Sequence, residues 1–284
     1  FKIKTLGFRG EALSSISAIS SMSISTHDGE DGIRLLISEG SIVSEKEIGM
    51  GQGTIIEVND LFFNTPVRKN YLKSKDVELN HITDIVTRYS LANIGISFKL
   101  ISDGKEIIVS PKTSDLINKI VGIYGKDIGK NMIPIDYKDD FVNIQGYIGK
   151  PYLAKTDKNL QSIFVNGRYV KSETVSKAIY EAYHTLLFLD RHPIVIMNIE
   201  IDFSEIDVNV HPTKNIIRIE KEDELYKSVF DALRDTFTKN DIIPEVSADN
   251  ETSMISKQNY NIEEGKQTML VQEEPKTDEY AKTS

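Results

Sequence analysis

The sequence has 0 cysteines in 284 residues, which excludes disulfide bonds and thiolate metal sites. No apolar run approaches the roughly 20 residues that span a bilayer, and no N-terminal stretch has the form of a signal peptide. The 5 histidines show no close metal-ligand spacing, which argues against a zinc site. These absences favour a cytoplasmic protein that uses no membrane.

An excess of positive charge is also absent: 43 acidic residues outnumber 34 lysine and arginine residues, so the net charge is -9. Residues 245–284 hold nine acidic and four basic residues, a balance of -5, so the other 244 residues carry -4. This composition argues against a generally basic nucleic-acid binder and leaves room only for a local basic patch. The length suits two domains of ordinary size, each with its own core.

Hydrophobic periodicity predicts mixed α and β elements in the first 110 residues. Two helices are expected, at 11–21 and 76–93. Short runs bounded by glycine and aspartate predict an antiparallel meander and a later hairpin. The expected strands are 22–26, 33–38, 41–47 and 54–58 in the meander, with 96–101 and 106–109 in the hairpin.

Residues 111–114 read as a domain joint, and a second α and β region follows up to residue 244. Ser172 is a suitable N-cap for a helix that runs to about 188. The other expected helices are 115–124 and 222–239, and the expected strands are 141–148, 162–165, 194–201, 207–210 and 216–219. From 245 to 284 periodicity disappears, which predicts a disordered acidic linker.

Two segments in the first region carry candidate chemistry. In TLGFRGEAL, residues 5–13, two glycines flank a short loop that runs into a helix, where free N–H groups suit an anion such as phosphate. On spacing alone a tight turn is the commoner interpretation, and the loop is not a Walker A motif. Gly53-Thr54 enters a strand, so the threonine is either an ordinary strand residue or a hydroxyl in a cleft. Pro66 is placed to start a helix.

Two further segments lie in the second region. Asn166-Gly167, between apolar runs, is a strong signal for a β-hairpin, and Arg168 follows the turn. Lys214 comes after a turn that contains Pro212. A lysine at a loop tip is usually just solvated, but at a phosphate site it supplies a point charge.

Taken in order, the strings TLGFRGEAL, GT…DLFFNTPVRK, FVNGRYV and DVNVHPTK resemble MutL proteins of DNA mismatch repair, over about Thr5 to Asp241. These proteins share an ATPase superfamily with gyrase B, ATP-dependent chaperones and sensor histidine kinases. FVNGR and VHPTK distinguish MutL from the chaperones and kinases.

The resemblance implies a fold and a set of site residues. The α+β fold would comprise the C-terminal part of an α/β sandwich ATPase lobe (1–110), then a transducer domain (111–244) with a mixed sheet and a left-handed βαβ crossover. Lys214 matches the lysine that reaches the γ-phosphate from the second domain, and Arg168 matches a basic position implicated in DNA contact. The implied ATP-binding residues are Gly7, Phe8, Arg9, Gly10, Glu11, Ala12, Leu13 and Thr54.

The resemblance also implies an activity and partners. The parent protein would bind and slowly hydrolyse ATP with Mg²⁺ and close a homodimeric clamp on duplex and mismatched DNA. It would take its signal from a mismatch-recognition protein of the MutS type and pass it to nucleases. The family's water-activating glutamate, its Mg²⁺-holding asparagine and its adenine-reading Asp-x-Gly-x-Gly motif have no match in this sequence. Two alternatives remain: a DNA-binding or docking module without catalysis, and a gyrase-type transducer.

Overall fold

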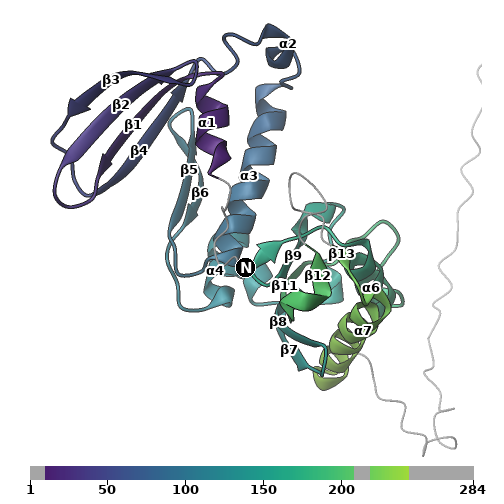
Figure 1. Cartoon of the computed structure of the whole chain (residues 1–284). Coiled ribbons are helices and arrows are strands. Elements are labelled where there is room, and N and C mark those ends of the chain that lie inside the picture. The colour runs from purple at the N-terminus through teal and green to yellow at the C-terminus, as the bar shows by residue number, and fades with distance from the viewer. Residues whose placement is uncertain (1–9, 208–217, 243–284) are drawn as a thin grey trace, which may run out of the picture. The chain divides into compact units, whose positions relative to one another are not determined.

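The computed structural model describes residues 10–207 and 218–242 (Figure 1). Within these ranges no helix combines the length and apolar character needed to cross a membrane. The predicted linker 245–284 and most of the two strands expected at 207–210 and 216–219 lie outside the described residues.

The first sheet follows helix α1 (Glu11–Ser17) and has four antiparallel strands, β1 (Ser21–His27), β2 (Gly32–Ser38), β3 (Ser41–Glu47) and β4 (Gly53–Asn59). Their order is β3-β2-β1-β4, so β1, β2 and β3 form the expected meander. The prediction was wrong for β4, which pairs with β1. The connection from Ile48 to Gln52 is too long for a tight hairpin turn, and it returns the chain to β1, where Ile56 pairs with Ile24.

Helix α1 ends at Ser17, earlier than the predicted end near residue 21. Serine hydroxyls compete with the helical backbone here, since Ser17 Oγ donates to the Ser14 carbonyl and Ser20 Oγ to the Ile16 carbonyl. The chain can then enter β1 directly.

The helix and hairpin predicted after the sheet are confirmed. Pro66 begins a short helix, α2 (Pro66–Lys69), and α3 spans Lys75–Ala92. Strands β5 (Phe98–Ser102) and β6 (Lys105–Ser110) form a separate two-stranded hairpin. Its turn uses Asp103 and Gly104, both with positive φ, as a tight hairpin turn requires.

The second region is built on a five-stranded sheet with the order β10-β9-β11-β8-β7. Its strands are β7 (Met132–Lys138), β8 (Val142–Gly149), β9 (Gln161–Val165), β10 (Arg168–Tyr169) and β11 (Val195–Ile201). A separate two-stranded sheet consists of β12 (Ile206–Asp207) and β13 (Arg218–Ile219). The helices are α4 (Leu116–Tyr124), α5 (Lys126–Gly129), α6 (Glu173–Tyr183) and α7 (Glu222–Lys239), with 3₁₀ turns at Pro151–Leu153, Lys158–Leu160 and Phe203–Glu205.

The mixed sheet that was expected is present. Strands β9 and β11 are parallel neighbours joined through α6, which makes a βαβ unit, and the other pairs are antiparallel. Ser172 caps α6 by accepting a hydrogen bond from Val175 N at 3.2 Å, as predicted. The helix stops at Tyr183 rather than near 188, because Leu186 and Leu187 pack against the core from a turn. Strand β7 was not predicted; it contains Pro134, which an edge strand tolerates.

Apolar side chains cover both faces of this sheet, so its central strands are buried on each side. On one face, residues such as Val165 and Met197 pack with α6 and α7. On the other, Phe164 and Ile196 pack with Ile120 of α4 and Leu91 of α3. Alternation along the strands sends successive residues to opposite cores. The last turns of α3 thereby join the core of the second region.

Candidate functional site

The glycine loop is described only from Gly10 onward, so the candidates Gly7, Phe8 and Arg9 lie outside the described residues. Gly10 has a φ of 65° and precedes α1, where no side chain caps the first N–H groups. Space is open within 4 Å of the position that a Cβ on Gly10 would occupy. Glu11, Ala12 and Leu13 are exposed. This stretch therefore presents accessible backbone donors, which suit an anion.

Thr54 lies in β4 and is paired across the sheet. Its Oγ1 is 2.9 Å from Thr26 Oγ1, directly opposite on β1. Both residues are exposed. Among the described residues no hydrogen bond joins Thr54 to the loop at Gly10. The threonine hydroxyl is therefore accessible and held by its strand partner.

The FVNGR string forms a hairpin turn between β9 and β10, as the sequence predicted. Asn166 has a φ of 50° and Gly167 a φ of 76°, the two positive values of a type I′ turn. The Asn166 side chain accepts from Ile201 N at 3.0 Å and donates to the Ile201 carbonyl at 2.9 Å. Gly167 N donates to Asn198 Oδ1 at 2.9 Å. The turn is thus fixed to β11, a role for Asn166 that the hairpin signal alone did not indicate.

Arg168 begins the short edge strand β10 and pairs with Val165 through the backbone. It is half-buried, and its guanidinium has no hydrogen bond or ion pair within the described parts of the chain. The hydrogen bonds of Asn166 and Gly167 hold the turn that precedes Arg168, so they position the backbone from which its side chain extends. Lys214, the other cationic candidate, falls outside the described residues.

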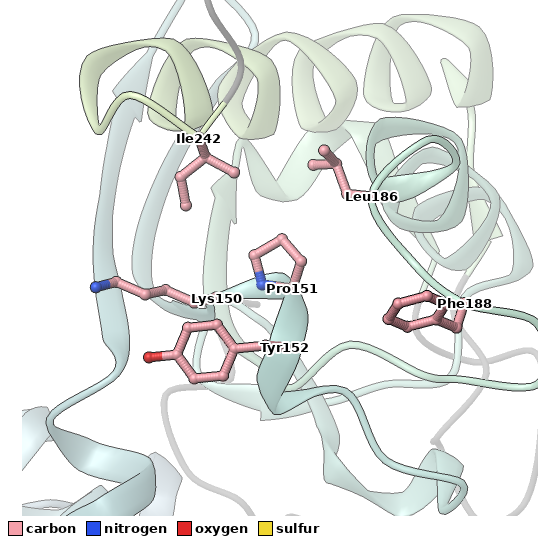
Figure 2. A pocket seen from close by; sticks show the side chains of 6 residues that line it. All are labelled: Lys150, Pro151, Tyr152, Leu186, Phe188 and Ile242. Carbon is pink, nitrogen blue, oxygen red and sulfur yellow. The ribbon is translucent and has the colours of Figure 1, made fainter. Parts of the chain in front are cut away.

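A hollow in the described chain lies apart from all of these residues. It has a volume of about 350 Å³ and lies in the second region, where Figure 2 shows Pro151 and Tyr152 on one side and Leu186 and Phe188 across from them. Among the described residues that line it, Lys150 alone is charged. In the described ranges no group of three or more histidine or acidic side chains is arranged to hold a metal ion. Neither feature indicates a catalytic centre.

Comparison with known proteins identifies the family. Residues 120–238 match the family model described as DNA mismatch repair protein, C-terminal domain. Over 250 residues the chain is 43% identical to the DNA mismatch repair protein MutL of Geobacillus kaustophilus, covering 88% of this chain and 40% of that protein. The chain belongs to the MutL family. MutL of Staphylococcus saprophyticus is 40% identical over 274 residues, which are 95% of this chain and 41% of that protein. This MutL-family chain spans about 40% of the length of the curated relatives that it matches.

Solved structures support the fold assignment. The crystal structure of the N-terminal domain of a DNA repair protein superposes with a TM-score of 0.72 at 28% identity, covering 85% of this chain and 78% of that one. The Aquifex aeolicus MutL ATPase domain complexed with ADP gives 0.56 at 22% identity, over 67% and 71%. This MutL-family chain therefore shares the α+β fold of these two solved domains.

Proposed function

We propose that this chain is the part of a MutL protein that couples ATP to DNA mismatch repair. The 43% identity to a curated MutL over 88% of the chain carries the proposal. The whole protein would act in the cytoplasm as a homodimeric, ATP-dependent clamp. It would respond to a MutS-type partner on mismatched DNA and signal to nucleases.

In this proposal residues 1–110 belong to the nucleotide lobe and residues 111–244 to the transducer. The loop from Gly7 to Leu13 would hold phosphates through its backbone N–H groups; the uncapped start of α1 and the open space at Gly10 fit that role. Thr54 would lie near the adenine, and Lys214 would reach the γ-phosphate. Bound ATP supplies a phosphoryl group for transfer to water. In that reaction the chain's own groups act by positioning and by charge.

The described residues fit Mg²⁺ less well than they fit the phosphates of ATP. In the described residues no group of three or more histidine or acidic side chains is arranged to hold the ion. Contact with DNA is assigned to the transducer and to Arg168. Its guanidinium has no protein partner in the described ranges and is available to a phosphate.

Complementation of a mutator strain tests the proposal. The complete reading frame, expressed in a bacterium that lacks its own MutL, should lower the mutation frequency toward the repair-proficient level. A Lys214→Ala form is the matched control and should leave the frequency high. If the intact protein is expressed and folded yet leaves the mutation frequency unchanged, while a MutL from a close relative of the host restores it, the assignment to mismatch repair is wrong.

A further inference from the structure

Arg88, near the end of α3, is buried although arginine usually reaches solvent. Its side chain is only 7% exposed. The guanidinium lies over the ring of Tyr169, with Cζ 3.8 Å from the ring centroid. Stacking of a desolvated guanidinium on an aromatic face is attractive and depends on the planar shape of arginine. The contact joins a helix of the first region to the edge strand of the second.

The hydrogen bonds of Arg88 hold the guanidinium in that orientation. Both Nε and Nη2 donate to Asp84 Oδ1, one helical turn earlier, at 2.8 and 2.6 Å. The third nitrogen, Nη1, is buried and has no partner within the described chain. Tyr124 of α4 belongs to the same cluster: burial raises its pKa to about 12, while the Ser162 hydroxyl and Arg88 oppose that shift. Burying a cation whose hydrogen bonds are incomplete costs stability. An apolar side chain would fill this site at a lower cost, so packing alone does not explain an arginine at position 88.

Tyr169 connects this cluster to the hairpin that carries Arg168. It pairs with Phe164 across β9 and β10, and the two rings meet edge to face with centroids 6.2 Å apart. Phe164 packs in the core that also contains Leu91 of α3. Neighbouring residues of a strand point to opposite faces, so Tyr169 contacts α3 while Arg168 points away from it. A shift of α3 would therefore move the base of Arg168 through one aromatic ring.

We propose that Arg88 is a positioning residue for DNA contact, which it affects by locking α3 onto Tyr169 and so fixing the hairpin that presents Arg168. Arg88 itself touches no DNA. The inference rests on the proposed contact between Arg168 and DNA. It adds a physical link by which movement of the last helix of the nucleotide lobe changes the affinity of the transducer for a phosphate backbone.

The test is a double-mutant cycle on protein from the complete reading frame, with affinity for a fluorescent DNA duplex measured over a series of salt concentrations. Arg88→Lys keeps the charge but loses the planar stack, and Tyr169→Leu removes the ring. Each should weaken binding roughly three- to tenfold. Each should also flatten the plot of log affinity against log salt in the same direction as Arg168→Ala. Arg34→Lys is the matched control, because Arg34 pairs with a carboxylate, Glu57, on an exposed sheet and should leave binding unchanged.

The combination with Arg168→Ala decides the outcome. If Arg88 acts through Arg168, Arg88→Lys adds almost nothing to the loss of affinity in the Arg168→Ala background, and the salt slope does not fall further. Independent, additive losses would mean that Arg88 contacts DNA itself or only stabilises the fold, and either result overturns the inference. If Arg168→Ala alone leaves the affinity unchanged, the proposed DNA contact fails first and this inference falls with it. A lowered melting temperature with wild-type affinity and slope would also overturn the inference.

Discussion

The side-chain amide of Asn166 is bonded twice to the main chain of Ile201, once as acceptor and once as donor. This pair fastens the turn between β9 and β10 to the end of the parallel neighbour β11. A hairpin of this length has little stability of its own, because β10 contains only two residues. Asn166 therefore acts as a structural clamp. It fixes the position of the backbone at Arg168, the residue that follows the turn.

Replacing Asn166 with alanine should lower the free energy of unfolding by about 2–3 kcal/mol, since two hydrogen bonds are lost and the N–H of the buried Ile201 is left unpaired. Alanine also resists the positive φ at this site. Urea denaturation measures the change. Asn240→Ala is the control, because Asn240 makes one bond to the Thr236 carbonyl at an exposed helix end and should lose far less. Equal losses for the two variants would contradict the clamp.

Lys119 forms hydrogen bonds at the start of the segment 111–114, which was predicted to join residues 1–110 to residues 111–244. Its buried Nζ donates to the carbonyls of Ile96 and Pro111 at 2.7 Å each, with a longer contact to Ser110 at 3.4 Å. Lys119→Met keeps the length of the side chain but leaves the carbonyls unpaired, so we expect a loss of about 2–4 kcal/mol in unfolding free energy. Lys126→Met, on exposed α5, should change stability by no more than about 0.5 kcal/mol. A stable, unchanged Lys119→Met protein would show that solvent replaces these bonds.

The sequence predicted individual helices, strands and turns better than it predicted which of these elements contact one another. Hydrophobic alternation placed β1, β2 and β3, and the Asn166-Gly167 pair placed the hairpin turn, because such features depend on a few neighbouring residues. It did not reveal that β4 returns to β1, since the strand pattern says which face is apolar but not which strand lies beside it. The FVNGR string located Arg168, whereas the partners that fix its hairpin lie far away in the chain.

Buried charges were the other features that pattern reasoning missed. Lys119 and Arg88 both occur in helices where a charged residue ordinarily marks the solvent side. Their burial depends on acceptors and rings supplied by other elements: the carbonyls around Pro111 for the lysine, and the ring of Tyr169 for the arginine. No spacing in α3 or α4 carries that information. A three-dimensional contact was needed to find it.

Asp139 should make the second region sensitive to acid. Burial raises its pKa, but hydrogen bonds from Ser228 Oγ, Val142 N and Phe141 N outweigh burial, and the pKa lies below the usual 3.8. A lowered folded-state pKa means that the stabilisation is complete above the unfolded pKa and is lost as pH falls through the folded one. Ser228→Ala removes a 2.6 Å bond to the carboxylate.

The melting temperature of Ser228→Ala should therefore be below that of the wild type at neutral pH, and the gap should narrow below about pH 4. Ser176→Ala on α6 is the control, with a difference that does not vary with pH. A gap for Ser228→Ala that stays constant into acid would show that the serine contributes by packing and not through the carboxylate.

Lys214→Ala should impair ATP hydrolysis more than ATP binding in protein from the complete reading frame. A lysine that engages the γ-phosphate as the domains close acts mostly in the transition state, so its loss lowers kcat by about 10²-fold and changes KM little. Lys227→Ala, at an exposed position on α7, provides the control and should keep normal kinetics. The assigned role is wrong if Lys214→Ala binds ATP many-fold more weakly but turns over normally at saturation.

Arg168→Glu should weaken DNA binding without changing sequence preference. The cation follows a turn held by Asn166 and has no protein partner among the described residues, so reversing its charge disturbs no described ion pair. A phosphate contact is indifferent to base sequence and sensitive to salt. Affinity for matched and mismatched duplexes should fall by the same factor, and the slope of log affinity against log salt should become shallower by about 1.

The same measurement separates the other possibilities for Arg168. Lys177→Glu, an exposed reversal on α6, carries the same change in net charge and controls for the long-range field. If both reversals weaken binding equally, the effect of Arg168→Glu is only that of net charge. Unchanged affinity at low salt, in a variant that melts like the wild type, would mean that Arg168 is a solvated residue of the hairpin and does not contact DNA. A loss confined to one sequence would indicate base recognition, which a side chain fixed at the edge of this sheet is not expected to provide.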